Sequence, residues 1–278
     1  MNDTNTVSFK ISGGSVIGNA HQKALRNNQD AFCIRESNNW IVGVVSDGCS
    51  GNIRSEINAY KTVNYLSVKA LSILENRNQF NFEKNYEKFL NELYSTYLSW
   101  LYFQIEAQFY DIKIDPNVMN FIKNEFIMES GFSTILFFAL NKNSGDIMYF
   151  SRGDGGICKN EELSFIQQNN VPAYPIYNII DPSASKEILI GYIHDADWQR
   201  FAIMSDGAER SEKESLFGNI FNPLNDKTEW LQSNLRFVKT YKKNESWDDD
   251  FTVITVQKVG QKVESEVKNG TNTNATAG

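Results

Sequence analysis

Two apolar runs along the chain end in the same three residues, Ser-Asp-Gly. Residues 40–45 lead into Ser46-Asp47-Gly48, and residues 201–204 lead into Ser205-Asp206-Gly207. Each run is short and continuous, which predicts a buried strand with a carboxylate where the strand stops. One Asp-Gly pair after a strand indicates an ordinary turn. Two matched copies instead favour two carboxylates that are fixed at strand ends on one edge of a sheet and hold a cation between them.

Three further aspartates stand beside apolar runs. Asp154 follows residues 147–150 by way of Ser151-Arg152-Gly153, and Asp30 directly precedes residues 31–34. The run Asp248-Asp249-Asp250 has the composition of a solvated turn, but it lies immediately before the β-rich residues 251–256. That position favours Asp249 as a ligand of the cation, with Asp250 holding Asp249 in place without binding the cation itself.

The remaining elements follow from the period of the apolar residues. Helical spacing begins near residue 53, returns over residues 82–109, and resumes after Asp115-Pro116, where proline suits the first turn. Strand spacing covers residues 7–16, with a break expected at Gly13-Gly14, and a hairpin is predicted over residues 132–150. Two more helices are expected, one after Asp206-Gly207 and one between Lys227 and Tyr241.

No linker divides residues 1–258, so the pattern predicts one α+β domain with paired sheets and helices outside. Prolines at 172, 175 and 182 make residues 169–198 an expected irregular insertion. Residues 259–278 are polar and are expected to be disordered.

Composition narrows the class of partner and compartment. The 278 residues carry a net charge of -7 with no basic stripe, which argues against nucleic acid or a membrane as the main partner. The three cysteines have no metal-ligand spacing, and an odd, sparse set fits a reducing compartment. The start is polar and no apolar stretch has the length of a membrane span. We therefore expect a soluble, cytoplasmic protein.

Taken in order, six motifs resemble the metal-dependent protein phosphatases of type 2C, the PPM family. The resemblance runs from about residue 10 to residue 258, and Gly18-x-x-His21 resembles a bacterial branch. It implies a four-layer α-β-β-α sandwich of two antiparallel sheets flanked by helices. The six motifs are Asn28-Gln29-Asp30, residues 45–51 (Val-Ser-Asp-Gly-Cys-Ser-Gly), residues 130–134 (Ser-Gly-Phe-Ser-Thr), Gly153-Asp154-Gly155, residues 204–207 (Met-Ser-Asp-Gly) and residues 249–252 (Asp-Asp-Phe-Thr).

The resemblance also implies a set of metal ligands. Asp47 would bridge two ions, and the Gly48 carbonyl would bind one of them. Asp206 and Asp249 would complete the ligands of the first ion, while Asp30 would act through a metal-held water. Asp154 matches the aspartate that, with Asp206, can hold a third, weaker ion.

Elementary chemistry supports this assignment. Carboxylate, carbonyl and water oxygens suit Mg²⁺ or Mn²⁺, and no histidine or thiol set for Zn²⁺ is present. Two ions about 3.5–4 Å apart make a bridging water acidic enough to be hydroxide, which can attack phosphorus in line. The implied activity is a serine/threonine phosphoprotein phosphatase in signalling. Its expected partner is a phosphorylated Ser/Thr protein, either a kinase or a kinase substrate.

Three positions depart from the family pattern. Gln29 replaces a glutamate, Cys49 replaces a histidine that serves as leaving-group acid, and Leu25 replaces a phosphate-binding arginine. His21, Lys23 and Arg26 lie close by in sequence, and one of them is expected to take the phosphate-binding role. The candidate catalytic set is therefore Asp47, Asp206, His21 and Arg26.

Simpler interpretations stay open for three residues of this region. His21 suits an ordinary surface or hydrogen-bonded residue, Arg26 a solvated loop charge, and Cys49 a packing residue. An alternative function is a catalytically silent phosphatase-like module that binds phosphopeptides or a partner protein. The five retained aspartates favour the enzyme, whereas Leu25 favours the silent module. A β-sandwich with structural Ca²⁺ would leave the family order of the Asp-Gly sites unexplained.

Overall fold

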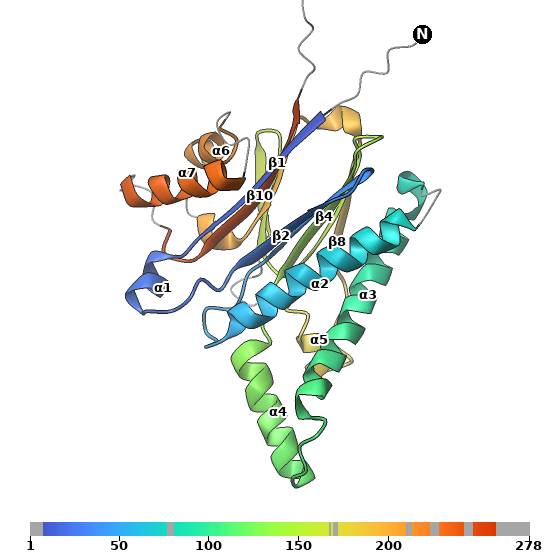
Figure 1. Cartoon of the computed structure of the whole chain (residues 1–278), viewed down its shortest axis with the longest axis vertical. Helices are drawn as coiled ribbons and strands as arrows, with labels where there is room; N and C mark the ends of the chain where they lie inside the picture. Colours follow the sequence, from blue (N-terminus) through green and yellow to red (C-terminus); the bar gives the residue numbers. More distant parts are fainter. Residues whose placement is uncertain are drawn as a thin grey trace, which may run out of the picture.

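In the computed structural model, which describes residues 8–76, 81–166, 168, 172–209, 213–222, 228–241 and 247–259, two antiparallel sheets pack face to face (Figure 1). The first sheet has the order β1-β10-β9-β6-β7 and the second the order β2-β3-β4-β5-β8. The first contains β1 (Ser8–Val16), β10 (Phe251–Val259), β9 (Arg200–Met204), β6 (Gly155–Lys159) and β7 (Glu162–Ile166). The second contains β2 (Ala31–Glu36), β3 (Trp40–Ser46), β4 (Ile135–Asn141), β5 (Ile147–Arg152) and β8 (Leu189–Ile193).

Helices cover both outer faces of the paired sheets, which confirms the four-layer α+β sandwich (Figure 1). The second sheet is covered by α2 (Ser55–Glu75) and α3 (Phe82–Phe109), and the first by α6 (Lys213–Ile220) and α7 (Thr228–Tyr241). With the end of α3, α4 (Pro116–Ser130) projects beyond the sheets (Figure 1). The short helices are α1 (Asn19–Lys23), α5 (Tyr177–Ile180), η1 (Asp195–Asp197) and η2 (Asp206–Ala208).

Three apolar clusters hold the layers together. Between the sheets lie Val45, Phe138 and Ile254, all buried. Between the second sheet and its helices lies a larger cluster to which α3 contributes many buried side chains, among them Phe89, Leu93 and Tyr97. A third cluster joins α6 and α7 to the first sheet. The helix expected over residues 82–109 is therefore confirmed and packs its apolar residues into the core.

The expected break in the first strand is wrong, because β1 runs without interruption through Gly13-Gly14. The glycines are needed there for space. A Cβ on Gly13 would lie 2.4 Å from the Phe32 ring, and one on Gly14 would lie 2.8 Å from Leu235. The two residues let an aromatic ring and a helix approach the strand from opposite sides.

The prediction that residues 169–198 are irregular is wrong for Leu189–Ile193, which form β8 at the edge of the second sheet. A glycine inside the strand and three upstream prolines hide its alternation from a sequence pattern. The segment forms a strand because it pairs with residues Ile147 to Ser151 of β5. The tail expected to be disordered lies outside the described residues apart from Val259, which ends β10. The domain limits themselves stay a prediction.

Candidate metal centre

The five aspartates that the sequence singles out gather at one rim of the sandwich. Within the second sheet, Ala31 pairs with Ser46, so Asp30 and Asp47 lie side by side at the ends of β2 and β3. Within the first sheet, Met204 pairs with both Gly156 and Val253, which brings Asp206 beside Asp154 and Asp249. The two sheets meet at the rim, where the Ser205 hydroxyl donates to Asp30 Oδ2 at 2.7 Å.

The carboxylates are close enough to oppose each other's ionisation. Burial raises the pKa of Asp47 well above its usual range, and the charges of Asp30 and Asp206 raise it further. Burial followed by the charge of Asp250 raises the pKa of Asp30 to about 7. Burial and the charge of Asp206 do the same for Asp154, again to about 7. A divalent cation among these oxygens would relieve the repulsion and favour the ionised forms.

Asp30 carries a second feature that fits a metal ligand. Its Oδ1 atom is buried and has no hydrogen-bond partner within the part of the chain that the structure describes. An unpartnered buried carboxylate oxygen is costly, and a cation or a cation-held water would satisfy it. The residues present therefore fit an oxygen-ligated divalent metal, as the sequence predicts.

Asp47 is held in position by the end of α4 and the start of β4. The Asp47 backbone N–H donates to Thr134 Oγ1 at 3.1 Å, and the Thr134 N–H donates to the Asp47 carbonyl at 2.8 Å. The next residue, Gly48, is buried and donates its N–H to the Gln29 carbonyl at 3.2 Å. The Gly48 carbonyl belongs to the following peptide, whose Cys49 N–H donates to the Phe132 carbonyl at 3.1 Å. That peptide is therefore fixed, and its carbonyl is available as a rigid oxygen ligand.

Glycines beside the aspartates make close approaches possible. A Cβ on Gly48 would lie 2.7 Å from the Gln29 carbonyl oxygen, and one on Gly207 would lie 1.8 Å from the Asp250 carbonyl oxygen. In both Ser-Asp-Gly sites the glycine lets the backbone just before a neighbouring strand, β2 or β10, pack closely against the turn. Gly153 and Gly155 differ, because their φ angles of 103° and 135° suit glycine alone and place Asp154 on a tight turn.

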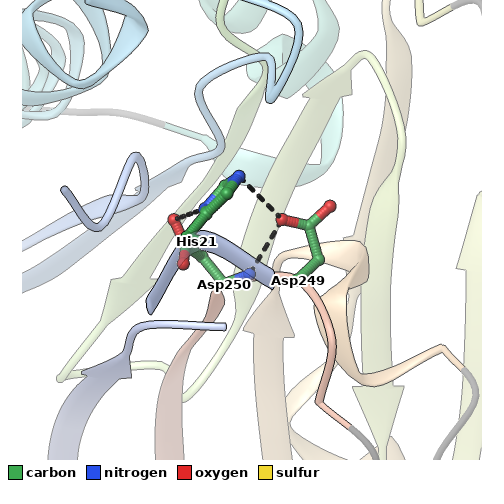
Figure 2. A group of neighbouring side chains, drawn as sticks. All are labelled: His21, Asp249 and Asp250. Atoms are coloured by element: carbon green, nitrogen blue, oxygen red, sulfur yellow. Dashed lines mark hydrogen bonds and ion pairs between the residues drawn. The ribbon is translucent and has the colours of Figure 1, made fainter. Parts of the chain in front are cut away.

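His21, Asp249 and Asp250 form a compact group beside the rim (Figure 2). His21 is only 5% exposed, so it is a buried residue and not the surface histidine that a lone loop position indicates. Its Nδ1 lies 2.9 Å from Asp250 Oδ2, and its Nε2 lies 3.8 Å from Asp249 Oδ1. The ligand atoms of the three lie within 4.8 Å of one another, so they could themselves hold an ion. The arrangement equally allows His21 and Asp250 to hold the Asp249 carboxylate in position, since the Asp249 side chain is itself 49% exposed.

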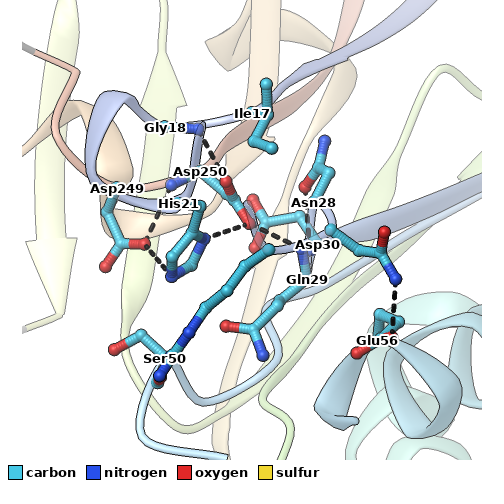
Figure 3. Close-up of polar contacts among 12 residues, drawn as sticks. Ile17, Gly18, His21, Asn28, Gln29, Asp30, Ser50, Glu56, Asp249 and Asp250 are labelled. Atoms are coloured by element: carbon cyan, nitrogen blue, oxygen red, sulfur yellow. Dashed lines mark hydrogen bonds and ion pairs between the residues drawn. The ribbon is translucent and has the colours of Figure 1, made fainter. Parts of the chain in front are cut away.

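Asp250 ties this group to the neighbouring loop (Figure 3). Its carboxylate accepts the backbone N–H groups of Gly18 at 2.6 Å and of Gln29 at 2.5 Å. A Cβ on Gly18 would lie 2.3 Å from the Asp249 carbonyl carbon, so only glycine fits there. The Gly18-x-x-His21 spacing thus lets one short helix press against the Asp249 backbone and place an imidazole beside its carboxylate.

Two of the departures from the family pattern, Leu25 and Gln29, lie between α1 and β2, and the third, Cys49, lies in the loop after β3. Leu25 is 94% exposed. Arg26 is exposed, and its Nη1 donates to the Ser50 carbonyl in the loop that follows Gly48. Gln29 is buried and donates from Nε2 to the Asn52 carbonyl at 2.7 Å, which fixes that same loop. Arg26 therefore lies beside the loop that carries Gly48 and Ser50.

Tyr174 is a site residue that the sequence patterns do not reveal. Burial raises its pKa, and so do the Cys49 thiol and the charges of Asp47 and Asp154, which places the phenol beside them. Its ring packs edge-on against Phe132 with centroids 5.3 Å apart. The only local signal is an aromatic residue enclosed by Pro172 and Pro175. The sequence roles assigned to Asp30, Asp47, Gly48, Asp154, Asp206 and Asp249 stay predictions, although the fold brings their segments together.

An α-β-β-α sandwich with an all-oxygen acidic centre at its rim is the architecture of a metal-dependent phosphatase. The family profile described as Protein phosphatase 2C matches residues 17–247, and the chain therefore belongs to that family. A bacterial serine phosphatase superposes with a TM-score of 0.57 at 13% identity, over 92% of this chain and 100% of that chain. Stp1, a serine/threonine phosphatase from Staphylococcus aureus, superposes with a TM-score of 0.58 at 11% identity, over 90% and 95% of the two chains.

At these identities the superpositions show the fold alone. No curated protein matches the chain. Among the helices that the structure describes, none combines the length and the apolar composition needed to cross a bilayer.

Proposed function

We propose that the chain is a Mn²⁺- or Mg²⁺-dependent phosphatase that hydrolyses phosphoserine and phosphothreonine in proteins. The observation that carries this proposal is the convergence of five aspartates from both sheets on one rim, beside the fixed Gly48 carbonyl. A purely structural rim would have no reason to accumulate carboxylates that raise one another's pKa. The substrate would be a phosphorylated kinase or kinase substrate.

Each ligand residue has a distinct task in this proposal. Asp47 would bridge two ions, and Asp206, Asp249 and the Gly48 carbonyl would complete their protein ligands. Asp30 would hold a water through its unpartnered Oδ1. Bound Mn²⁺ or Mg²⁺ supplies Lewis acidity, which activates water and offsets phosphate charge. Asp154, presented on its own turn, would add a weaker outer site.

The phosphate would meet Arg26 as it enters. The Ser50 carbonyl holds the guanidinium at the loop that carries Gly48, so Arg26 can offset phosphate charge although Leu25 occupies the usual arginine position. The exposed Leu25 is the feature that favours a silent phosphopeptide-binding module. The neighbouring Arg26 and the five aspartates favour the enzyme.

Hydrolysis of p-nitrophenyl phosphate and of a phosphothreonine peptide, with and without Mn²⁺, tests the proposal. We expect turnover of both with Mn²⁺, and its reversible loss on chelation by EDTA. Peptide binding without turnover in Mn²⁺ would establish the silent module instead. Turnover that survives complete chelation would overturn the metal mechanism.

A further inference from the structure

A cavity of about 700 Å³ opens between the end of β5, α5 and the segment that leads into β8. Its apolar wall includes Tyr177, Ile180 and Leu189. The side chains of Ile180 and Leu189 are about half exposed, at 48% and 50%. Large apolar side chains held open to solvent in a concave site are typical of a ligand-binding surface.

The cavity is kept open by two buried polar side chains. Arg152, which is 6% exposed, donates from Nη1 to the Glu187 carbonyl and from Nη2 to the Ser185 carbonyl at 2.6 Å. Asn178, also 6% exposed, donates to the Ala184 and Ser185 carbonyls at 3.1 and 3.0 Å. The wall formed by this segment is therefore preorganised, so a ligand would not have to order it. Arg152 Nε is also buried, with no hydrogen-bond partner among the described residues.

Two residues that line the cavity place it near the carboxylate rim. Arg152 lines it, and Asp154 follows only two residues later, a span of at most about 7 Å. Tyr177 also lines the cavity, and its ring lies 5.9 Å between centroids from that of Tyr174, whose pKa the charges of Asp47 and Asp154 raise. A peptide whose phosphoresidue sits at the rim would therefore have its flanking residues within reach of this cavity.

The charges of the cavity select the chemistry of that peptide. Asp181 and Glu187 line it, and both are exposed. Hydrogen bonds from Ser183 lower the pKa of Asp181, so that carboxyl is ionised at neutral pH. The one guanidinium of the lining, that of Arg152, is already engaged by backbone carbonyls. The lining therefore offers net negative charge beside apolar surface.

We propose that this cavity is a specificity subsite that binds an apolar and a basic side chain of the protein substrate, two to four residues from the phosphoresidue. The spacing follows from the rise of about 3.3 Å per residue in an extended peptide. The inference rests on the proposed phosphatase function and names its substrate class: phosphoproteins with apolar and Lys or Arg residues flanking the phosphosite.

The test compares two phosphothreonine peptides that differ only in flanking charge, one with Leu and Arg and the other with Leu and Glu. The measured quantity is the ratio of their kcat/KM values in Mn²⁺. We expect the wild type to favour the Arg peptide, and Glu187→Lys to shift the ratio about tenfold toward the Glu peptide. Arg152 contacts the backbone carbonyl of Glu187, so the substitution leaves the wall in place.

Glu161→Lys is the matched control, because it makes the same charge change at an exposed position after the far end of β6 from Asp154. It should leave the wild-type ratio as it is. A wild-type ratio near one, or an equal shift in both variants, would overturn the subsite. Hydrolysis of p-nitrophenyl phosphate by the wild type separates the two levels: if it persists, only the subsite fails, and if it is absent, the phosphatase proposal fails with it.

Discussion

At the scale of single residues, Asp250 joins the parts of the site that the sequence shows only as separate motifs. Its buried carboxylate accepts the N–H groups of Gly18 and Gln29 and faces His21 Nδ1. In Asp250→Asn, an NH₂ group would face one of these donors. We expect the free energy of unfolding to fall by about 1–3 kcal/mol in urea denaturation. Asp248→Asn, at an exposed neighbour, is the control; equal stability of both variants would exclude a tying role for Asp250.

His21 could either position Asp249 or donate a proton to the leaving group, and kinetic measurements distinguish these two roles. Its enclosed position beside Asp249 favours a positioning role. Because Cys49 replaces the family's leaving-group acid, His21 is also a candidate proton donor to the leaving group. Loss of an outer partner of a metal ligand costs about 10–100-fold in metal affinity. We therefore expect His21→Gln to raise the Mn²⁺ concentration for half-maximal activity about tenfold, equally for aryl phosphate and phosphopeptide. A larger loss for the peptide at saturating Mn²⁺ would assign the proton-donor role instead.

At the scale of elements, the sequence predicts those parts of the site that lie at the ends of strongly apolar strands. Asp47 and Asp206 are found in this way because continuous apolar runs identify β3 and β9. Tyr174 and Arg152 are missed as site residues because their positions depend on α5 and β8, whose order comes from pairing with β5. Local sequence carries no trace of that tertiary contact.

The turn between β5 and β6 separates Asp154 from the other ligands. Asp154 is the single carboxylate on the Gly153–Gly155 turn. Among neighbouring charges, that of Asp206 raises the pKa of Asp154 most. Asp154→Ala should leave tight Mn²⁺ binding intact in calorimetry. Turnover should fall by roughly tenfold or more, with a higher Mn²⁺ requirement. If the tight binding also disappears, Asp154 belongs to the inner pair of ions.

At the scale of the whole molecule, the rim couples stability to pH. In the metal-free fold the pKa values of Asp30 and Asp154 are raised to about 7 from the ordinary aspartate value of 3.8. Between about pH 4 and pH 7 the folded state holds more protons than the unfolded chain, so metal-free stability falls as pH rises. Divalent ions replace those protons. The difference in melting temperature between Mn²⁺ and EDTA samples should therefore grow from pH 5 to pH 7.5, and a constant difference would contradict this linkage.

The proposed mechanism requires aspartates from both sheets to hold the ions jointly, with Asp47 shared between them. Calorimetric titration of Mn²⁺ into the wild type and Asp47→Asn, with phosphopeptide turnover measured on the same samples, tests this requirement. An amide cannot bridge two cations as a carboxylate does. We expect the folded variant to lose tight Mn²⁺ binding and its turnover to fall by several orders of magnitude. Tight binding and near wild-type turnover in Asp47→Asn would contradict it.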